Sequence, residues 1–210
     1  MPATTPIASS KSAALTRILD AIPRGYQSYT FGTIPAAKTE YLAKKFHQLY
    51  GVGLSRAQRL ARKKKGRANT LLVIYWPDTS KDAEWVLMAT SGTGLEENKL
   101  NRFDEKPKFI FLGYELSRHT TFGKLAWTWK RTKQEMTELH LLIESQAGTH
   151  NFSALASTLE RIARQPGFHG VNRQSQELLM AARRHGYSGE LPKLFYLRKV
   201  SHGEPLQLEP

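Results

Sequence analysis

Closely spaced cationic side chains between residues 55 and 67 are the strongest chemical signal in this sequence. The segment SRAQRLARKKKGR has Ser55 and Gln58 at the spacing of a helix capping box, and its glycine stands where a helix ends. At 100° per residue, four cations share one arc of this predicted helix: Arg56, Arg59, Arg62 and Lys63. Guanidinium and ammonium groups in such a row bind the oxygens of a polyanion.

Another arc of the same predicted helix carries Ala57, Leu60 and Ala61. We expect this arc to dock on the core, which leaves the cationic arc facing outward. Like charges at this spacing repel one another, and a bound polyanion relieves the repulsion. The ordinary alternative is a solvated charged face with no partner.

The positive charge is concentrated in one part of the chain. The whole chain has 31 Lys or Arg, 18 Asp or Glu and a formal net charge of +13, but residues 38–67 contain ten of these cations and a single acidic residue, Glu40. The next acidic residue after Glu40 is Asp78, so ion pairs within the segment cannot neutralise it. The predicted nucleic-acid contacts in this segment are Lys38, Lys44, Lys45, Arg56, Gln58, Arg59, Arg62, Lys63, Lys64, Lys65 and Arg67.

A second basic segment, KLAWTWKR, alternates as a strand does. Lys124 and Lys130 fall on one face of this strand, and Trp127, Trp129 and Arg131 fall on the other. Two tryptophans on one face are either a stacking platform for bases or part of the core. In both cases we expect the strand to border the basic surface, which adds Lys124, Lys130 and Arg131 to the predicted contacts.

An alternative chemistry is metal-independent cleavage of RNA, which needs a general acid or base and a cation that stabilises the phosphorane. Tyr114, Arg118 and His119, near the end of a predicted strand, are the catalytic candidates. Small endoribonucleases that process guide RNAs are also basic, independent of cysteine and of about this size. The glycine-rich stretch expected near their C-terminus is not found, because GYSGE offers two glycines only. We therefore assign no family.

Several other classes of site are excluded by composition. The chain has no cysteine, which removes disulfides, thiol nucleophiles and cysteine-based zinc sites. The seven histidines are scattered, so we predict no metal and no cofactor. No apolar run of about 18 residues is present, so we expect no membrane partner. The first eleven residues lack the features of a signal peptide, and a cytoplasmic location is the expectation.

Hydrophobic periodicity predicts an α+β fold, with a mainly antiparallel sheet of four to six strands and helices packed on one face. We expect a flexible tail over residues 1–11 and a single domain over 12–210, with a boundary near 146–151 as the alternative. The predicted helices cover residues 12–22, 35–51, 55–66 and 174–185, with two more around 136–143 and 155–162. The predicted strands cover residues 25–35, 69–76, 84–90, 108–118, 124–131 and 191–200.

Together these patterns predict a non-enzymatic nucleic-acid-binding protein that presents a basic helical face to the phosphate backbone. It would act alone or with other protein subunits in a nucleoprotein complex. The alternatives are the metal-independent endoribonuclease and a basic adaptor that binds an acidic protein. The sequence leaves open whether the partner is RNA or DNA, and single-stranded or duplex.

Overall fold

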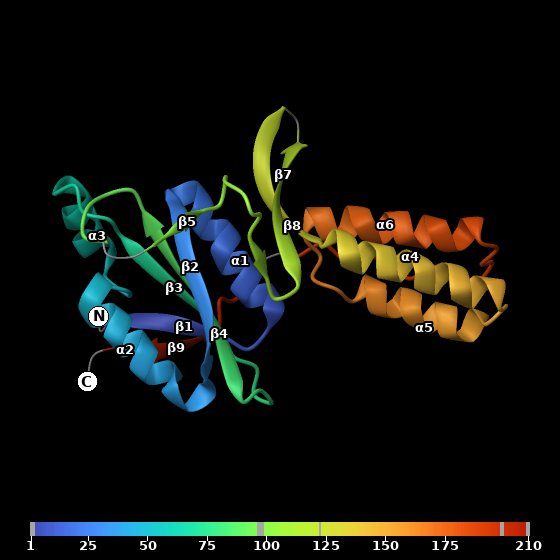
Figure 1. The fold of residues 1–210 in the computed structure, drawn as a ribbon, viewed down its shortest axis with the longest axis horizontal. Helices are drawn as coiled ribbons and strands as arrows, with labels where there is room; N and C mark the ends of the chain where they lie inside the picture. Colours follow the sequence, from blue (N-terminus) through green and yellow to red (C-terminus); the bar gives the residue numbers. More distant parts are fainter. Residues whose placement is uncertain (1–2, 96–98, 122, 198–199, 209–210) are drawn as a thin grey trace. The chain divides into compact units, whose positions relative to one another are not determined.

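The computed structural model describes residues 3–95, 99–121, 123–197 and 200–208. Within these ranges the protein has an α+β fold, as predicted, with a six-stranded sheet, a three-stranded sheet and helices packed around them (Figure 1). The chain divides into two compact units, Met1–Pro107 with Val200–Pro210, and Lys108–Lys199. We call them the first unit and the second unit.

The first unit contains the six-stranded sheet, whose strands follow the order β5-β2-β4-β3-β1-β9. β1 and β3 are parallel, and every other neighbouring pair is antiparallel. The β3–β4 hairpin was predicted, and its register places Leu72 opposite Leu87. The elements of this unit are β1 (Thr4–Ala8), α1 (Lys11–Ala21), η1 (Ile22–Arg24), β2 (Tyr26–Pro35), η2 (Ala36–Lys38), α2 (Thr39–Tyr50), α3 (Arg56–Lys64), β3 (Thr70–Tyr75), β4 (Asp82–Thr90), β5 (Asn101–Arg102) and β9 (Glu204–Gln207).

Part of the segment predicted as a flexible tail is β1, a strand between β3 and β9. Thr5 is fully buried there, and its Oγ1 donates a hydrogen bond to the carbonyl oxygen of Leu72 at 3.1 Å. β1 is five residues long, contains Pro6 and has little apolar alternation, so its strand conformation depends on the neighbouring strands.

α2 packs on one face of this sheet. Phe46 meets the Trp85 ring edge-on, with the ring centroids 5.3 Å apart, and the core beneath includes Leu72, Ile74 and Leu87. Side chains alternate along β3, so Leu71 points to the face of the sheet opposite α2. α1 packs against β3 as well. Leu71 lines the space beside α3 that is described below.

The second unit contains the three-stranded sheet and a bundle of three helices. Its elements are β6 (Ile110–Phe111), β7 (Tyr114–Thr121), β8 (Lys124–Arg131), α4 (Lys133–Gly148), α5 (Phe152–Ala163) and α6 (His169–Arg184). The bundle core includes Ile143, Leu155, Leu159 and Leu178. The boundary considered near residues 146–151 coincides with the turn between α4 and α5, inside this unit.

Two strand predictions differ from the structure. The strand predicted over 108–118 is broken into β6 and β7, because Leu112 and Gly113 adopt a left-handed turn with φ of 53° and 87°. The strand predicted over 191–200 is not formed in its described part, residues 191–197 and 200. The amide of Leu197 donates instead to the carbonyl of Gly167 at 3.0 Å, which ties the segment to the α5–α6 loop.

No helix in the described ranges has both the length and the apolar character needed to span a bilayer.

Candidate nucleic-acid interface

α3 begins at the predicted capping box. The Ser55 Oγ accepts a hydrogen bond from the amide of Gln58 at 3.3 Å, and the Gln58 Oε1 accepts one from the amide of Ser55 at 2.8 Å. The helix ends at Lys64, two residues before Gly66, whose φ of 68° is left-handed. The predicted capping box is therefore confirmed, the helix ends two residues before the predicted stop at Gly66, and Gln58 stabilises its first turn.

A glycine turn carries the chain from α2 into α3. Gly51 ends α2 with a φ of 75°, and Gly53 follows with a φ of 81°. A Cβ atom at Gly53 would lie 2.5 Å from Leu208 Cδ1 and 2.8 Å from the carbonyl oxygen of Thr4. Only glycine combines this backbone angle with such a close approach. The turn therefore holds the start of α3 against β1.

The rotation of α3 about its axis differs from the prediction. Ala57, Leu60 and Ala61 were expected to dock on the core, but all three are exposed, and Leu60 retains 55% of its accessible surface. Arg59 and Arg62 are partly buried instead. Half of the cationic arc, Arg59 and Arg62, thus turns toward the body of the first unit, whereas Arg56 and Lys63 stay exposed as expected.

Polar contacts explain this rotation. The Nε and Nη2 of Arg62 donate to the carbonyl oxygen of Ala68 at 3.1 and 2.9 Å. The Asn69 Nδ2 donates to the carbonyl oxygen of Arg59 at 3.1 Å. These bonds tie α3 to the start of β3 through its cationic side, at the cost of leaving Ala57, Leu60 and Ala61 exposed. Arg62 therefore has a structural role.

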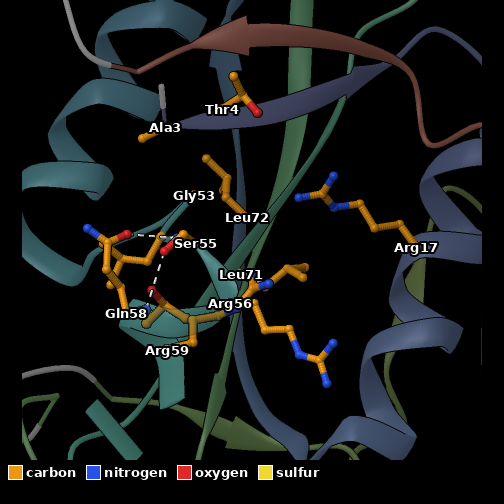
Figure 2. A pocket seen from close by; sticks show the side chains of 12 residues that line it. Ala3, Thr4, Arg17, Gly53, Ser55, Arg56, Gln58, Arg59, Leu71 and Leu72 are labelled. Carbon is orange, nitrogen blue, oxygen red and sulfur yellow. Dashed lines mark hydrogen bonds between the residues drawn. The ribbon is translucent and has the colours of Figure 1, made fainter. Parts of the chain in front are cut away.

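Two adjoining pockets, of about 440 and 710 Å³, lie beside α3, and Arg56, Arg59 and Leu71 line both of them. We call the two together the basic groove. Arg17 of α1 lines the first pocket, and Figure 2 shows its side chain extending from α1 toward α3. The second pocket adds Arg24, Tyr26, Lys63 and Asn69.

Five cationic side chains line the basic groove, and no Asp or Glu of the described ranges lines it. Its cationic side chains are Arg17, Arg24, Arg56, Arg59 and Lys63. None of the five has an Asp or Glu of the described chain within ion-pair distance. Burial lowers the pKa of Arg17 to about 10; Tyr26 opposes this shift, and the nearby Arg59 and Arg24 add to it. The Arg17 side chain nevertheless stays charged at neutral pH.

Sequence reasoning missed Arg17 and Arg24. Arg17 follows the buried Ala14 by three residues, which places it at the border of the buried stripe of α1. Helix spacing offers Asp20 as its acidic partner. The Asp20 Oδ2 instead lies 3.0 Å from the Nε2 of His202. Arg17 and Asp20 therefore form no ion pair with each other.

The other predicted cations of the first unit lie outside the two pockets. Lys44 pairs with Glu40 at 2.7 Å and is thereby neutralised. The remaining ones are exposed side chains with no carboxylate partner in the described ranges: Lys38, Lys45, Lys64, Lys65 and Arg67.

β8 of the second unit contains the other predicted contacts, and Arg131 among them is buried. Its Nη1 donates to the Val171 carbonyl at 3.1 Å, and its Nη2 donates to the Ile162 carbonyl and the Ser175 Oγ at 3.2 and 3.0 Å. Glu135 lies 3.7 Å from the Arg131 Nε. A guanidinium enclosed in this way cannot reach a phosphate, so we no longer count Arg131 among the nucleic-acid contacts.

The rest of β8 contributes less cationic surface than predicted. Lys130 lies 3.4 Å from Glu115 and is paired, whereas Lys124 is exposed. Trp129 is fully buried, so it belongs to the core, and the Trp127 ring is covered by the guanidinium of Arg118 at 4.4 Å.

The three catalytic candidates are not brought together. The Tyr114 hydroxyl is bonded to Gln165, and burial raises the pKa of Tyr114 to about 12, which disqualifies it as a base at neutral pH. Arg118 covers a tryptophan ring, as described above. His119 points to the face of β7 opposite Arg118 and stacks on His169, with ring centroids 4.3 Å apart. No group of three or more His, Asp or Glu side chains suited to a metal occurs in the described ranges.

Comparison with known proteins yields no match for this chain among protein-family models, curated proteins or solved structures. Its function therefore has to be argued from its own residues. Among the features described above, the basic groove is the one whose chemistry points to a ligand class, namely phosphates.

Proposed function

We propose that this protein binds nucleic acid through the basic groove and the exposed lysines around α3, without catalysing a reaction on it. The phosphate backbone is the polyanion that the groove accepts. The protein acts alone or as a subunit of a nucleoprotein complex in the cytoplasm.

The observation that best supports this proposal is the row of unneutralised cations along the groove. Five cationic side chains from η1, α1 and α3 surround two adjoining pockets without a described acidic partner. Cations held this close repel one another, and when they neutralise phosphates they release the cations condensed on the nucleic acid. Free energy from counterion release supplies most of the affinity of non-specific nucleic-acid binding.

Base contacts in this proposal come from the second pocket. Tyr26 and Leu71 provide apolar surface there, and Asn69 provides an amide. Phosphate contacts position a strand but carry no sequence information, so any base preference depends on these side chains. A groove of this size admits single strands, whose bases are free to enter a pocket.

The test measures the affinity of the purified protein for a fluorescent single-stranded RNA, the matching DNA strand and the DNA duplex at several salt concentrations. A protein that neutralises several phosphates shows a linear fall of log affinity with log salt, with a slope of roughly −0.7 for each phosphate on a single strand. We expect a slope steeper than about −2 for the strands.

The same titration is repeated with the triple variant Arg56→Ala, Arg59→Ala, Lys63→Ala. We expect its affinity to fall roughly 30-fold, or about 2 kcal/mol, for every sequence alike. The matched control removes the same charge from exposed arginines of the second unit, Arg161, Arg173 and Arg184. Equal losses in both variants, or a flat salt dependence of the wild type, would contradict the proposal. Salt-dependent binding to an acidic protein with none to nucleic acid would indicate the adaptor function instead.

A further inference from the structure

Arg17 has an unusual set of partners for a partly buried arginine. Its Nη2 donates to the Thr5 Oγ1 at 3.2 Å, and that hydroxyl donates onward to the carbonyl of Leu72. Its Nε is buried and has no hydrogen-bond partner in the described part of the chain. A guanidinium offers five N–H donors, so most of the capacity of Arg17 is unused.

The unused donors belong to a side chain that lines the first pocket. Arg17 approaches this pocket from α1, and Arg56 and Arg59 line it from α3 (Figure 2). Thr4 and Ser55 add two hydroxyl groups, and no described acidic residue lines it. Removing a cation from water without a counter-charge is unfavourable, and an anion that brings several acceptor oxygens compensates for this.

The depth of Arg17 distinguishes the type of phosphate. The backbone phosphates of a duplex lie on the outside of a wide cylinder, so they reach the exposed Arg56 and Lys63 at the rim. Arg17 is partly buried, and its Nε is fully enclosed. A phosphate at the end of a flexible strand can enter this recess, and it presents three oxygens and up to two negative charges.

The adjoining pocket suits the nucleoside attached to that phosphate. It shares Arg56, Arg59 and Leu71 with the first pocket and adds Tyr26 and Asn69. The buried Asn69 Oδ1 is an acceptor with no hydrogen-bond partner in the described ranges. Volumes of about 440 and 710 Å³ are within the range of small-molecule sites.

We propose that the Arg17 pocket binds a phosphate monoester, either the terminal phosphate of a nucleic-acid strand or that of a free nucleotide, with the attached nucleoside beside Tyr26 and Asn69. This inference rests on the proposed function, because it names the part of the nucleic acid that the groove recognises.

The experiment compares one oligonucleotide sequence in three forms, with a 5′-phosphate, with a 3′-phosphate and with neither, and adds adenosine monophosphate as a competitor. We expect one phosphorylated form to bind roughly tenfold or more tightly than the unphosphorylated strand, by the free energy of an added charge-assisted contact. Tight binding of the mononucleotide, with no difference among the strands, would identify the free nucleotide as the source of the phosphate. Equal binding of all three strands and no competition would overturn this inference and leave the proposed function standing. No binding of any strand or nucleotide would overturn both.

Variants of Arg17 test the assignment to this pocket. Arg17→Met should abolish the preference for the phosphate monoester, whereas Arg17→Lys retains the charge and should keep part of it. Lys81→Met, on an exposed lysine of the first unit that is neither a predicted contact nor part of the groove, is the control and should leave the preference intact. In phosphate-free buffer Arg17→Met should melt no lower than the wild type, because it removes an unneutralised buried charge. If Arg17→Met does not fold, Arg59→Gln at the pocket wall replaces it. A preference that survives in the variant that folds would contradict the assignment.

Discussion

Arg17 and Arg131 are two arginines enclosed in different units, and their surroundings are opposite. Arg131 is surrounded by acceptors, since two carbonyls, a serine hydroxyl and Glu135 lie around its guanidinium. Arg17 has one hydroxyl partner, two neighbouring arginines across a pocket and no described carboxylate at ion-pair distance. Burial lowers the pKa of both side chains; Glu135 and Tyr114 oppose this at Arg131, whereas at Arg17 Tyr26 opposes it and Arg59 and Arg24 reinforce it.

This difference separates a structural arginine from a binding one. A buried cation that donates three hydrogen bonds to its own chain holds secondary structure together, as Arg131 joins β8 to α5 and α6. The Arg131 Nε, like that of Arg17, has no hydrogen-bond partner in the described ranges, but it lies 3.7 Å from Glu135. A cation left without such partners beside a pocket keeps its bonding capacity for a ligand. Positive charge alone does not distinguish the two, because in the sequence both residues are simply arginines.

The largest effect is expected for Arg131→Met. The substitution removes the donor shared by Val171, Ile162 and Ser175, so we expect the second unit to lose roughly 3–5 kcal/mol of stability. Urea denaturation with hydrogen exchange at α5 and α6 measures the loss. Arg161→Met, an exposed arginine of α5, should change stability by less than about 0.5 kcal/mol. A loss below about 1 kcal/mol at Arg131 would remove the contrast with Arg17.

Gly53→Ala should have the next largest effect. The new Cβ would meet Leu208 and the Thr4 carbonyl at a left-handed backbone angle, and we expect a loss of about 2 kcal/mol. Gly66→Ala has a similar backbone angle with no atom within 4 Å of the new Cβ, so it isolates the backbone contribution of about 1 kcal/mol. Because Gly53 positions α3 beside β1, only Gly53→Ala should also weaken nucleic-acid binding. Equal effects of both variants on stability and binding would argue against this role of the turn.

Ser55→Ala should cost about 1 kcal/mol of stability through loss of the capping box. The first turn of α3 contains Arg56, so we expect a weaker affinity for nucleic acid as well. Thr132→Ala removes the equivalent cap of α4, where the Thr132 Oγ1 accepts from the amide of Glu135 at 3.2 Å. It should lower the stability of the second unit by a similar amount and leave binding unchanged, as measured by thermal melting and fluorescence anisotropy.

The smallest effect concerns pH and His119. Burial and the neighbouring His169 lower the pKa of His119, so its neutral form is favoured in the folded state. The stability that His119 contributes is therefore present above its unfolded pKa of about 6.5 and declines as the pH falls through that value. Urea midpoints at pH 7.5 and 5.0 should differ slightly less for His119→Gln than for the wild type. Identical pH dependence would show that the histidine pair has no such role.

Local signals in the sequence were sufficient for α3 and for the β3–β4 hairpin. The capping box needs only Ser55, Gln58 and their spacing, and the apolar run of β3 is buried wherever it lies in a sheet. β1 was missed because five residues around Pro6 carry no periodic signal, and their strand conformation comes from pairing with β3 and β9.

The rotation of α3 could not be predicted from its amphipathic pattern. The pattern favours burial of Ala57, Leu60 and Ala61, but the bonds from Arg62 to the Ala68 carbonyl and from Asn69 to the Arg59 carbonyl, six and ten residues away, decide the orientation. Arg17 was missed for a related reason, because its isolation depends on Asp20 pairing with His202, which is 182 positions further along the chain. Such choices among alternative partners are made by the tertiary structure.

The most direct measurement is ultraviolet cross-linking of the wild-type protein to a single-stranded RNA, followed by mass spectrometry of the cross-linked peptides. The account predicts cross-links within residues 24–31 and 54–71, which contain Tyr26, α3 and Asn69, and a strong reduction in the Arg56→Ala, Arg59→Ala, Lys63→Ala variant. Cross-links confined to β8 or to the helices of the second unit, unchanged in that variant, would contradict it.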